Sequence, residues 1–122
     1  MSNIGLNANI YHVTGKYLNL LNDFIVQFKS HPKNIDRLKK EELVSFFSKI
    51  NNAETLEPQF QLLTSIIERE LREKGKPSIA YFNNIISEVE KGESDKFIPK
   101  LEFIVDVLDS EHFEALAKIK GE

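Results

Sequence analysis

Apolar residues recur three and four positions apart along almost the whole chain, and this spacing constrains the fold more than any other feature. An α-helix brings such residues onto one face, so the spacing is typical of amphipathic helices that bury one stripe in a shared core. Strand-like alternation between hairpin turns does not occur. Because 122 residues suit one domain, the sequence predicts an all-α fold, a single-domain bundle of five to six short helices.

The first helix is expected to begin at Thr14, whose hydroxyl can cap it, with Tyr17 the first residue of its apolar face. Pro32 should end this helix, because the residue before a proline is pushed out of helical geometry. The sequence therefore divides into an N-terminal arm over residues 1–13, which can be mobile, and a helical domain over residues 14–119.

Two further helices follow. The second is expected over residues 36–50. The third should begin at Thr55 or Glu57, with Pro58 tolerated in its first turn because the missing N–H would have no partner there. Gly75 is a natural end for this helix.

Glycine and proline also mark the next two helices. Ser78 can cap a fourth helix, and Gly92 should stop it. Pro99 favours a helix start, so a fifth helix is expected to begin near Phe97.

A short sixth helix is expected after Leu108, capped by Asp109 or Ser110 and burying Phe113 and Leu116. The inward positions of the helices together predict a core. Its main members are expected to be Leu21, Phe24, Phe47, Leu63, Ile67, Ile86, Ile104 and Leu108.

The composition and the lack of long apolar segments bear on the compartment in which the protein is expected. The chain has no cysteine, which excludes disulfides and thiolate metal sites. Its first residues lack the basic region and apolar run of a secretory signal, and no apolar stretch approaches the roughly 18 residues that cross a bilayer. We expect a soluble cytoplasmic protein, a monomer or a homodimer, without a membrane segment.

The net charge of −3 conceals two segments of opposite sign. Residues 29–49 carry six basic and three acidic side chains, whereas residues 81–116 carry three lysines and nine acids. The phosphate backbone of a nucleic acid attracts lysine and arginine, so the acidic segment disfavours a nucleic acid as the partner.

No constellation of catalytic or metal-binding residues is evident. The three histidines, His12, His31 and His112, lie in separate segments and lack the i,i+4 spacing of a helical zinc site. His112 is expected to be an exposed residue beside a helix start. The phosphate-binding glycine patterns are missing as well. The sequence thus predicts a protein that is not an enzyme and uses no cofactor and no metal.

One segment carries a resemblance. The run Ile-Ser-Glu-Val-Glu-Lys-Gly over residues 86–92 resembles the end of the DNA-reading helix in phage-repressor-type helix-turn-helix proteins. In that family a short loop and another amphipathic helix follow, and here the likeness continues to about residue 109. The resemblance implies a DNA-binding function, with Asn83, Asn84 and Lys91 as the residues that would contact DNA.

The first half of that motif does not fit. The family places a scaffold helix and a tight turn at a fixed distance before the reading helix, whereas residues 74–78, Lys-Gly-Lys-Pro-Ser, should break a helix there. The acidic side chains around the segment would also repel phosphates.

The leading hypothesis is a non-enzymatic helical interaction or regulatory module, such as an adaptor, an inhibitor or an immunity-like protein, that acts by binding another protein. A degenerate helix-turn-helix DNA-binding regulator is the alternative. Two charged segments are candidate partner-binding surfaces: a basic one with Lys33, Arg37, Lys39 and Lys40, and an acidic one with Glu88, Glu90, Glu93 and Asp95.

Overall fold

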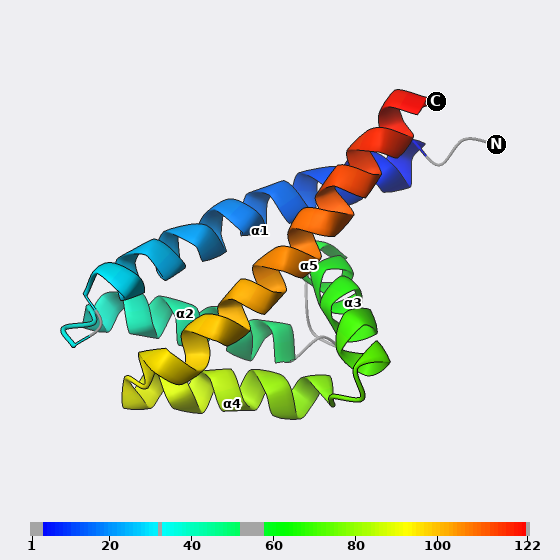
Figure 1. The fold of residues 1–122 in the computed structure, drawn as a ribbon. Helices are drawn as coiled ribbons and strands as arrows, with labels where there is room; N and C mark the ends of the chain where they lie inside the picture. Colours follow the sequence, from blue (N-terminus) through cyan, green and yellow to red (C-terminus); the bar gives the residue numbers. More distant parts are fainter. Residues whose placement is uncertain (1–3, 32, 52–57, 122) are drawn as a thin grey trace.

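The computed structural model describes residues 4–31, 33–51 and 58–121 of the chain (Figure 1). This part contains five α-helices and no strand, so the predicted all-α single domain is confirmed. The starts expected at Thr55 or Glu57 and the break at Pro32 lie outside the described residues. The helices are α1 (Ile4–Ser30), α2 (Arg37–Asn51), α3 (Pro58–Glu73), α4 (Ser78–Lys91) and α5 (Ser94–Gly121).

The helices form two antiparallel pairs with a fifth helix set across them (Figure 1). The long helices α1 and α5 pack along most of their length, and α2 packs against α4. Helix α3 runs across one side and contacts all four others. The start of α1 and the end of α5 therefore lie at the same end of this pair (Figure 1).

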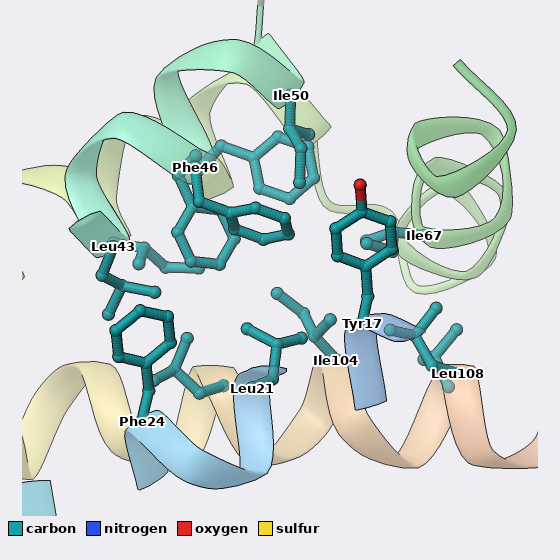
Figure 2. Close-up of a cluster of buried hydrophobic side chains, with 14 of the residues drawn as sticks. Tyr17, Leu21, Phe24, Leu43, Phe46, Ile50, Ile67, Ile104 and Leu108 are labelled. Carbon is teal, nitrogen blue, oxygen red and sulfur yellow. The ribbon is translucent and has the colours of Figure 1, made fainter. Parts of the chain in front are cut away.

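The core fills the space between the two pairs. Figure 2 shows Leu21 and Phe24 of α1 pointing toward Leu43 of α2, while Ile104 of α5 and Ile67 of α3 close the same cluster. All five side chains are buried. Burial of apolar side chains of this size, at about 1.5–3 kcal/mol each, is what holds the pairs together.

Most of the predicted core is confirmed. Ile86 is the exception, because it is only half-buried on the edge of α4. The other seven predicted residues are buried: Leu21, Phe24, Phe47, Leu63, Ile67, Ile104 and Leu108.

The prediction of an N-terminal arm is wrong for residues 4–13, because these residues form the first turns of α1. Thr14 is not a cap. It is fully buried in mid-helix, and its hydroxyl donates to the Ile10 carbonyl one turn earlier at 2.7 Å. The physical reason is tertiary: Asn7 and Val13 are buried together with Thr14, so this part of α1 has a packed face that caps alone do not reveal. Residues 1–3 lie outside the described residues.

The expected break at residues 109–110 is also wrong, because α5 continues through it as one helix. Asp109 and Ser110 are exposed, and neither residue is a strong helix breaker. Glu111 bonds to Arg69 of α3, which holds the following turn in helical register. In that register Phe113 points outward, with 62% of its surface exposed, and not into the core.

The ends of α4 and α5 differ slightly from the prediction. The residue before α4 is Pro77, whose carbonyl accepts the first helical hydrogen bond, and no side chain caps this helix. Ser78 is therefore the first helical residue. Gly92 ends α4 in the left-handed conformation (φ 72°), as expected for a C-terminal stop. Helix α5 begins at Ser94, three residues before Phe97, because its first turn is held by bonds to the Glu93 carbonyl.

None of the helices in the described part of the chain combines the length and the hydropathy of a bilayer-crossing segment.

Candidate functional site

The two charged segments meet at one end of the bundle. Because α2 and α4 are antiparallel, the start of α2 lies beside the end of α4 (Figure 1). The Lys40 ammonium would be 4.0 Å from a Cβ atom built on Gly92. The basic and acidic candidate surfaces are thus neighbours and form a surface of mixed charge.

The basic segment is largely balanced within its own helix. Arg37 pairs with Glu41 at 3.1 Å, and Lys39 lies 3.9 Å from Glu42. Lys33 is exposed just before the helix. Exposed pairs of this kind contribute little stability, but they reduce the positive potential of the segment.

The acidic segment is balanced in the same way. Glu88 accepts from the Lys100 ammonium at 2.7 Å, in a pair that is mostly buried between α4 and α5. Glu93 pairs with Lys96 at 2.8 Å. The hydrogen bond with the Lys96 ammonium holds the pKa of the Glu93 carboxyl below its usual value, and the same bond raises the pKa of Lys96.

Glu90 and Asp95 are exposed, and no ion pair joins either of them to another described residue. Of the four predicted acidic residues, only these two leave their charge open to a partner. The surface at this end is therefore weakly charged.

Tyr81 shows how closely α4 is packed on α5. Its ring is buried, and its hydroxyl lies 3.4 Å from the Lys100 carbonyl. Burial, together with the nearby Glu88 carboxylate, raises the Tyr81 pKa to about 12. The position holds the helices together and is unavailable to a partner.

The outer face of α4 is polar and uncharged at its centre. Asn83 and Asn84 are both exposed, and Lys91 is exposed at the end of the helix. The Asn51 amide donates to the Asn83 side-chain oxygen at 2.9 Å, which ties this face to the end of α2. The three residues of the DNA-binding alternative therefore share an accessible helix.

A groove that the sequence did not predict runs between α1 and α2. These two helices are not among the closely packed pairs, because aromatic rings space them apart. The rings of Tyr17, Phe46 and Phe60 lie 5.4–6.4 Å from one another and form its floor. Leu38 stands at one end with 67% of its surface exposed, and the groove has a volume of about 540 Å³. The available signal was Leu38 itself, an apolar residue outside the inward stripe of its helix.

A second groove follows the contact between α1 and α5, and His112 lies in it. His112 is half-buried in mid-helix, not exposed beside a helix start as predicted. Its Nδ1 atom is 2.9 Å from the Thr14 hydroxyl and 3.0 Å from the Tyr11 carbonyl, and its ring stacks on the Tyr11 ring at 4.2 Å.

Gly15 leaves room for the His112 ring at this position, because glycine has no side chain. A Cβ atom on Gly15 would lie 3.1 Å from the Cε1 atom of the imidazole, which is tighter than ordinary side-chain contacts. Within the described residues, no three histidine or carboxylate side chains are grouped to hold a metal ion.

Comparison with family models, with curated proteins and with solved structures finds no match for this chain.

Proposed function

We propose that this protein is a non-enzymatic module that binds another protein, and that the α1–α2 groove receives an amphipathic helix of the partner. The observation that carries the proposal is an apolar groove with an aromatic floor and an exposed leucine, Leu38, at one end. Helix-in-groove recognition uses such a surface, because apolar side chains spaced three and four apart fill it.

The walls of the groove suit a helix. Helix α2 lines it with Leu38, Phe46 and Lys49, and α1 contributes Leu20 and Phe24. Leu20 and Phe60 are half-buried, whereas Tyr17 and Phe46 are buried, so some apolar surface remains available for contact. A partner helix that covers this surface removes apolar area from water, which drives association.

The rim of the groove carries charged side chains of both signs at its two ends. Glu41 and Glu42, which also lie beside Arg37 and Lys39 at 3.1 and 3.9 Å, line the half of the groove near the start of α2, and Lys49 lines the opposite half. A partner helix with a basic residue beside the glutamates and an acidic residue beside Lys49 would complement this order. The charges select the orientation of the partner, and the apolar floor supplies most of the affinity.

The test compares two variants of matched exposure. Leu38→Asp places a carboxylate in the groove, and Ile79→Asp places one on α4, where the isoleucine is 66% exposed. Both residues are the second of their helices, so the new charge meets the same helix dipole in each variant. Proteins captured from a native lysate by the wild type are identified, produced in pure form and measured by calorimetry.

We expect Leu38→Asp to weaken binding about 10- to 150-fold, the equivalent of about 1.5–3 kcal/mol for one buried leucine. Ile79→Asp should bind as the wild type does. A variant with Lys39→Glu and Lys40→Glu addresses the mixed-charge surface. If that variant or Ile79→Asp loses the partner while Leu38→Asp retains it, the groove is not the binding site.

Binding of DNA is the second candidate function, and it is favoured by the accessible amides of Asn83 and Asn84 on α4. An asparagine can bond adenine in the major groove. Glu88 faces Lys100 and so does not oppose phosphates as the sequence implied. Lys91 is an exposed cation on the same helix that can approach the phosphate backbone.

We rank DNA second, because this surface has few cations and nonspecific affinity depends on them. In a gel-shift with mixed duplex DNA at about 50 mM salt, where electrostatic binding is strongest, we expect no retarded band. A band that disappears with Asn83→Ala plus Asn84→Ala, or with Lys91→Glu, would make DNA binding the leading function.

A further inference from the structure

The side of α1 that lines the α1–α2 groove carries an apolar stripe that continues past the groove to the start of the helix. Residues at this kind of spacing form one seam along a helix, the pattern by which helices pair in coiled coils. Tyr17, Leu20 and Phe24 line the groove, so the other half of the stripe lies beyond it. The members of the stripe recur four and three residues apart in turn: Leu6, Ile10, Val13, Tyr17, Leu20 and Phe24.

The half of the stripe beyond the groove is open to solvent at its end. Leu6 has 54% of its surface exposed, and Ile10 is half-buried. Helices α2 and α4 lie along the C-terminal half of α1, so the first turns of α1 project beyond them together with the end of α5 (Figure 1). Val13, in the middle of the stripe, is buried. Apolar surface is therefore accessible at both ends of the stripe, at Leu6 and Ile10 and again at the half-buried Leu20.

The first three turns of α1 lack charged side chains. Charged residues make up 29% of the chain, but residues 4–15 contain no Asp, Glu, Lys or Arg. The uncharged positions include exposed ones such as Ala8 and Asn9. Depletion of charge around an exposed apolar residue is typical of the centre of a protein–protein interface. The first turns of α1 thus have the composition of a surface that another chain covers.

The stripe is symmetric about its centre. The intervals between its members are 4, 3, 4, 3 and 4 residues, which read the same in both directions from residue 15. If two copies of α1 pair antiparallel about a twofold axis at this residue, Leu6 of one copy faces Phe24 of the other. Ile10 then faces Leu20. A twofold dimer requires a surface that complements itself in this way.

The charges of the groove suit the start of α1. In this pairing the start of α1 reaches the end of the groove that Leu38, Glu41 and Glu42 line. A helix start carries partial positive charge, and the first turn of α1 has no acidic residue of its own to balance it. Arg37 and Lys39 offset part of the negative charge of the two glutamates. The attraction is therefore weak, and it favours the antiparallel direction while the apolar stripe supplies the affinity.

Lys16 opposes the pairing. It flanks the middle of the stripe, and its ammonium lies 5.4 Å from the centre of the Tyr17 ring. Near the twofold axis the Lys16 side chains of the two copies would repel each other. Because Lys16 is exposed, this repulsion is screened in physiological salt. It lowers the affinity that the apolar contacts provide, so Lys16→Gln should tighten the dimer.

We propose that two copies of this chain form an antiparallel dimer in which the first turns of α1 of each copy fill the α1–α2 groove of the other. The dimer uses the groove of the proposed function, and the inference rests on that function in this one respect. A partner helix and the second copy compete for one surface, so the dimer is the resting form and a partner binds the monomer.

Sedimentation equilibrium of the purified full chain measures the dimer without any partner. We expect a reversible monomer–dimer equilibrium, in which Leu6→Asp raises the dissociation constant about 100-fold, from about tenfold for each of the two leucines. The new carboxylate lies in the first turn of α1 and favours the helix, so loss of the dimer is not loss of the fold. Val26→Asp is the matched control and should dimerise as the wild type does, because Val26 is 62% exposed on α1 outside the stripe.

Cysteine cross-links test the direction of the pairing. The chain has no cysteine, so each variant carries a single thiol. A mixture of Ile10→Cys and Leu20→Cys should form a disulfide between copies on oxidation, because these positions face each other. Neither variant alone should cross-link, since equal positions in the antiparallel pair lie about 15 Å apart, too far for a disulfide.

A wild-type chain that is monomeric at millimolar concentration would overturn the proposal. A dimer that Leu6→Asp leaves intact, or one in which Ile10→Cys cross-links with itself, would do the same. Failure of the proposed function has a different signature: the dimer forms and Leu6→Asp dissociates it, but no protein binds the open groove of that variant. If only the dimer fails, a partner binds the wild type and Leu6→Asp equally, and both are monomers.

Discussion

Whether residues 94–121 form one helix or two is testable at Ser110, because the two arrangements predict stability changes of opposite sign. Ser110 is exposed within α5, and no hydrogen bond joins its side chain to another described residue. In a helix interior, Ser110→Ala should stabilise the protein by up to about 0.5 kcal/mol through helix propensity. If Ser110 capped a separate sixth helix, the same change would destabilise it by about 0.5–2 kcal/mol.

Ser110→Pro gives a larger difference. In a continuous α5 the proline removes one helical hydrogen bond and clashes with the Asp106 carbonyl, at a cost of about 3 kcal/mol. The unfolding entropy is about 2.1 cal/mol/K per residue, so the unfolding free energy of the 122-residue chain falls by about 0.26 kcal/mol per degree near the melting temperature. The variant should therefore melt about 12 °C below the wild type. In the two-helix arrangement with Asp109 as the cap, a proline at this first position would be tolerated.

The assay is thermal and urea unfolding followed by circular dichroism at 222 nm on the wild type and both variants. A destabilised Ser110→Ala variant, as expected if Ser110 caps a separate helix, would refute a continuous α5, and so would a Ser110→Pro variant close to the wild type, as expected if Asp109 is the cap.

Three further predictions concern the core, a helix end and a buried phenol. Leu63→Ala should cost about 2–5 kcal/mol in urea unfolding because the side chain is fully buried, and Ile86→Ala should cost less because Ile86 is half-buried; equal costs would contradict the burial pattern. Gly92→Ala should lower the unfolding free energy by about 1–2 kcal/mol, since its φ of 72° strains any residue with a Cβ atom, and an unchanged midpoint would mean that α4 ends differently. Burial and the Glu88 carboxylate raise the Tyr81 pKa from 10.0 to about 12, so the unfolded chain ionises this phenol first and stability should fall, by at most about 3 kcal/mol, as the pH rises from about 10 to 12. Ultraviolet titration and unfolding of the wild type beside Tyr81→Phe measure this loss, which the variant should lack.

Local sequence signals predicted the helices well where a breaker or an apolar stripe was decisive. Gly92 ends α4 in the left-handed conformation that only glycine adopts without strain. The stripes of Leu63 with Ile67 and of Ile104 with Leu108 fall in the core, because residues that recur at the helical period must share a face. The class of fold followed from this periodicity alone.

The same signals were misleading where a residue has two uses. Thr14 can cap a helix or sit inside one, and which applies depends on the burial of Asn7 and Val13 beside it. Asp109 and Ser110 can likewise start a helix or continue one. Here α5 continues because the turn after them is anchored to other helices, through Glu111 on Arg69 and through the His112 ring on Thr14.

For the candidate sites, the sequence identified the charged residues but not which of them form ion pairs with one another. Glu88 and Lys100 are 12 residues apart, and only the angle between α4 and α5 brings them to 2.7 Å. Both grooves depend on relations between helices in the same way. The periodicity of the chain determined that it folds into helices with buried stripes, because that rule is local. The tertiary structure alone decided that aromatic rings hold α1 away from α2 and that Gly15 admits His112, because these contacts join residues far apart in the chain.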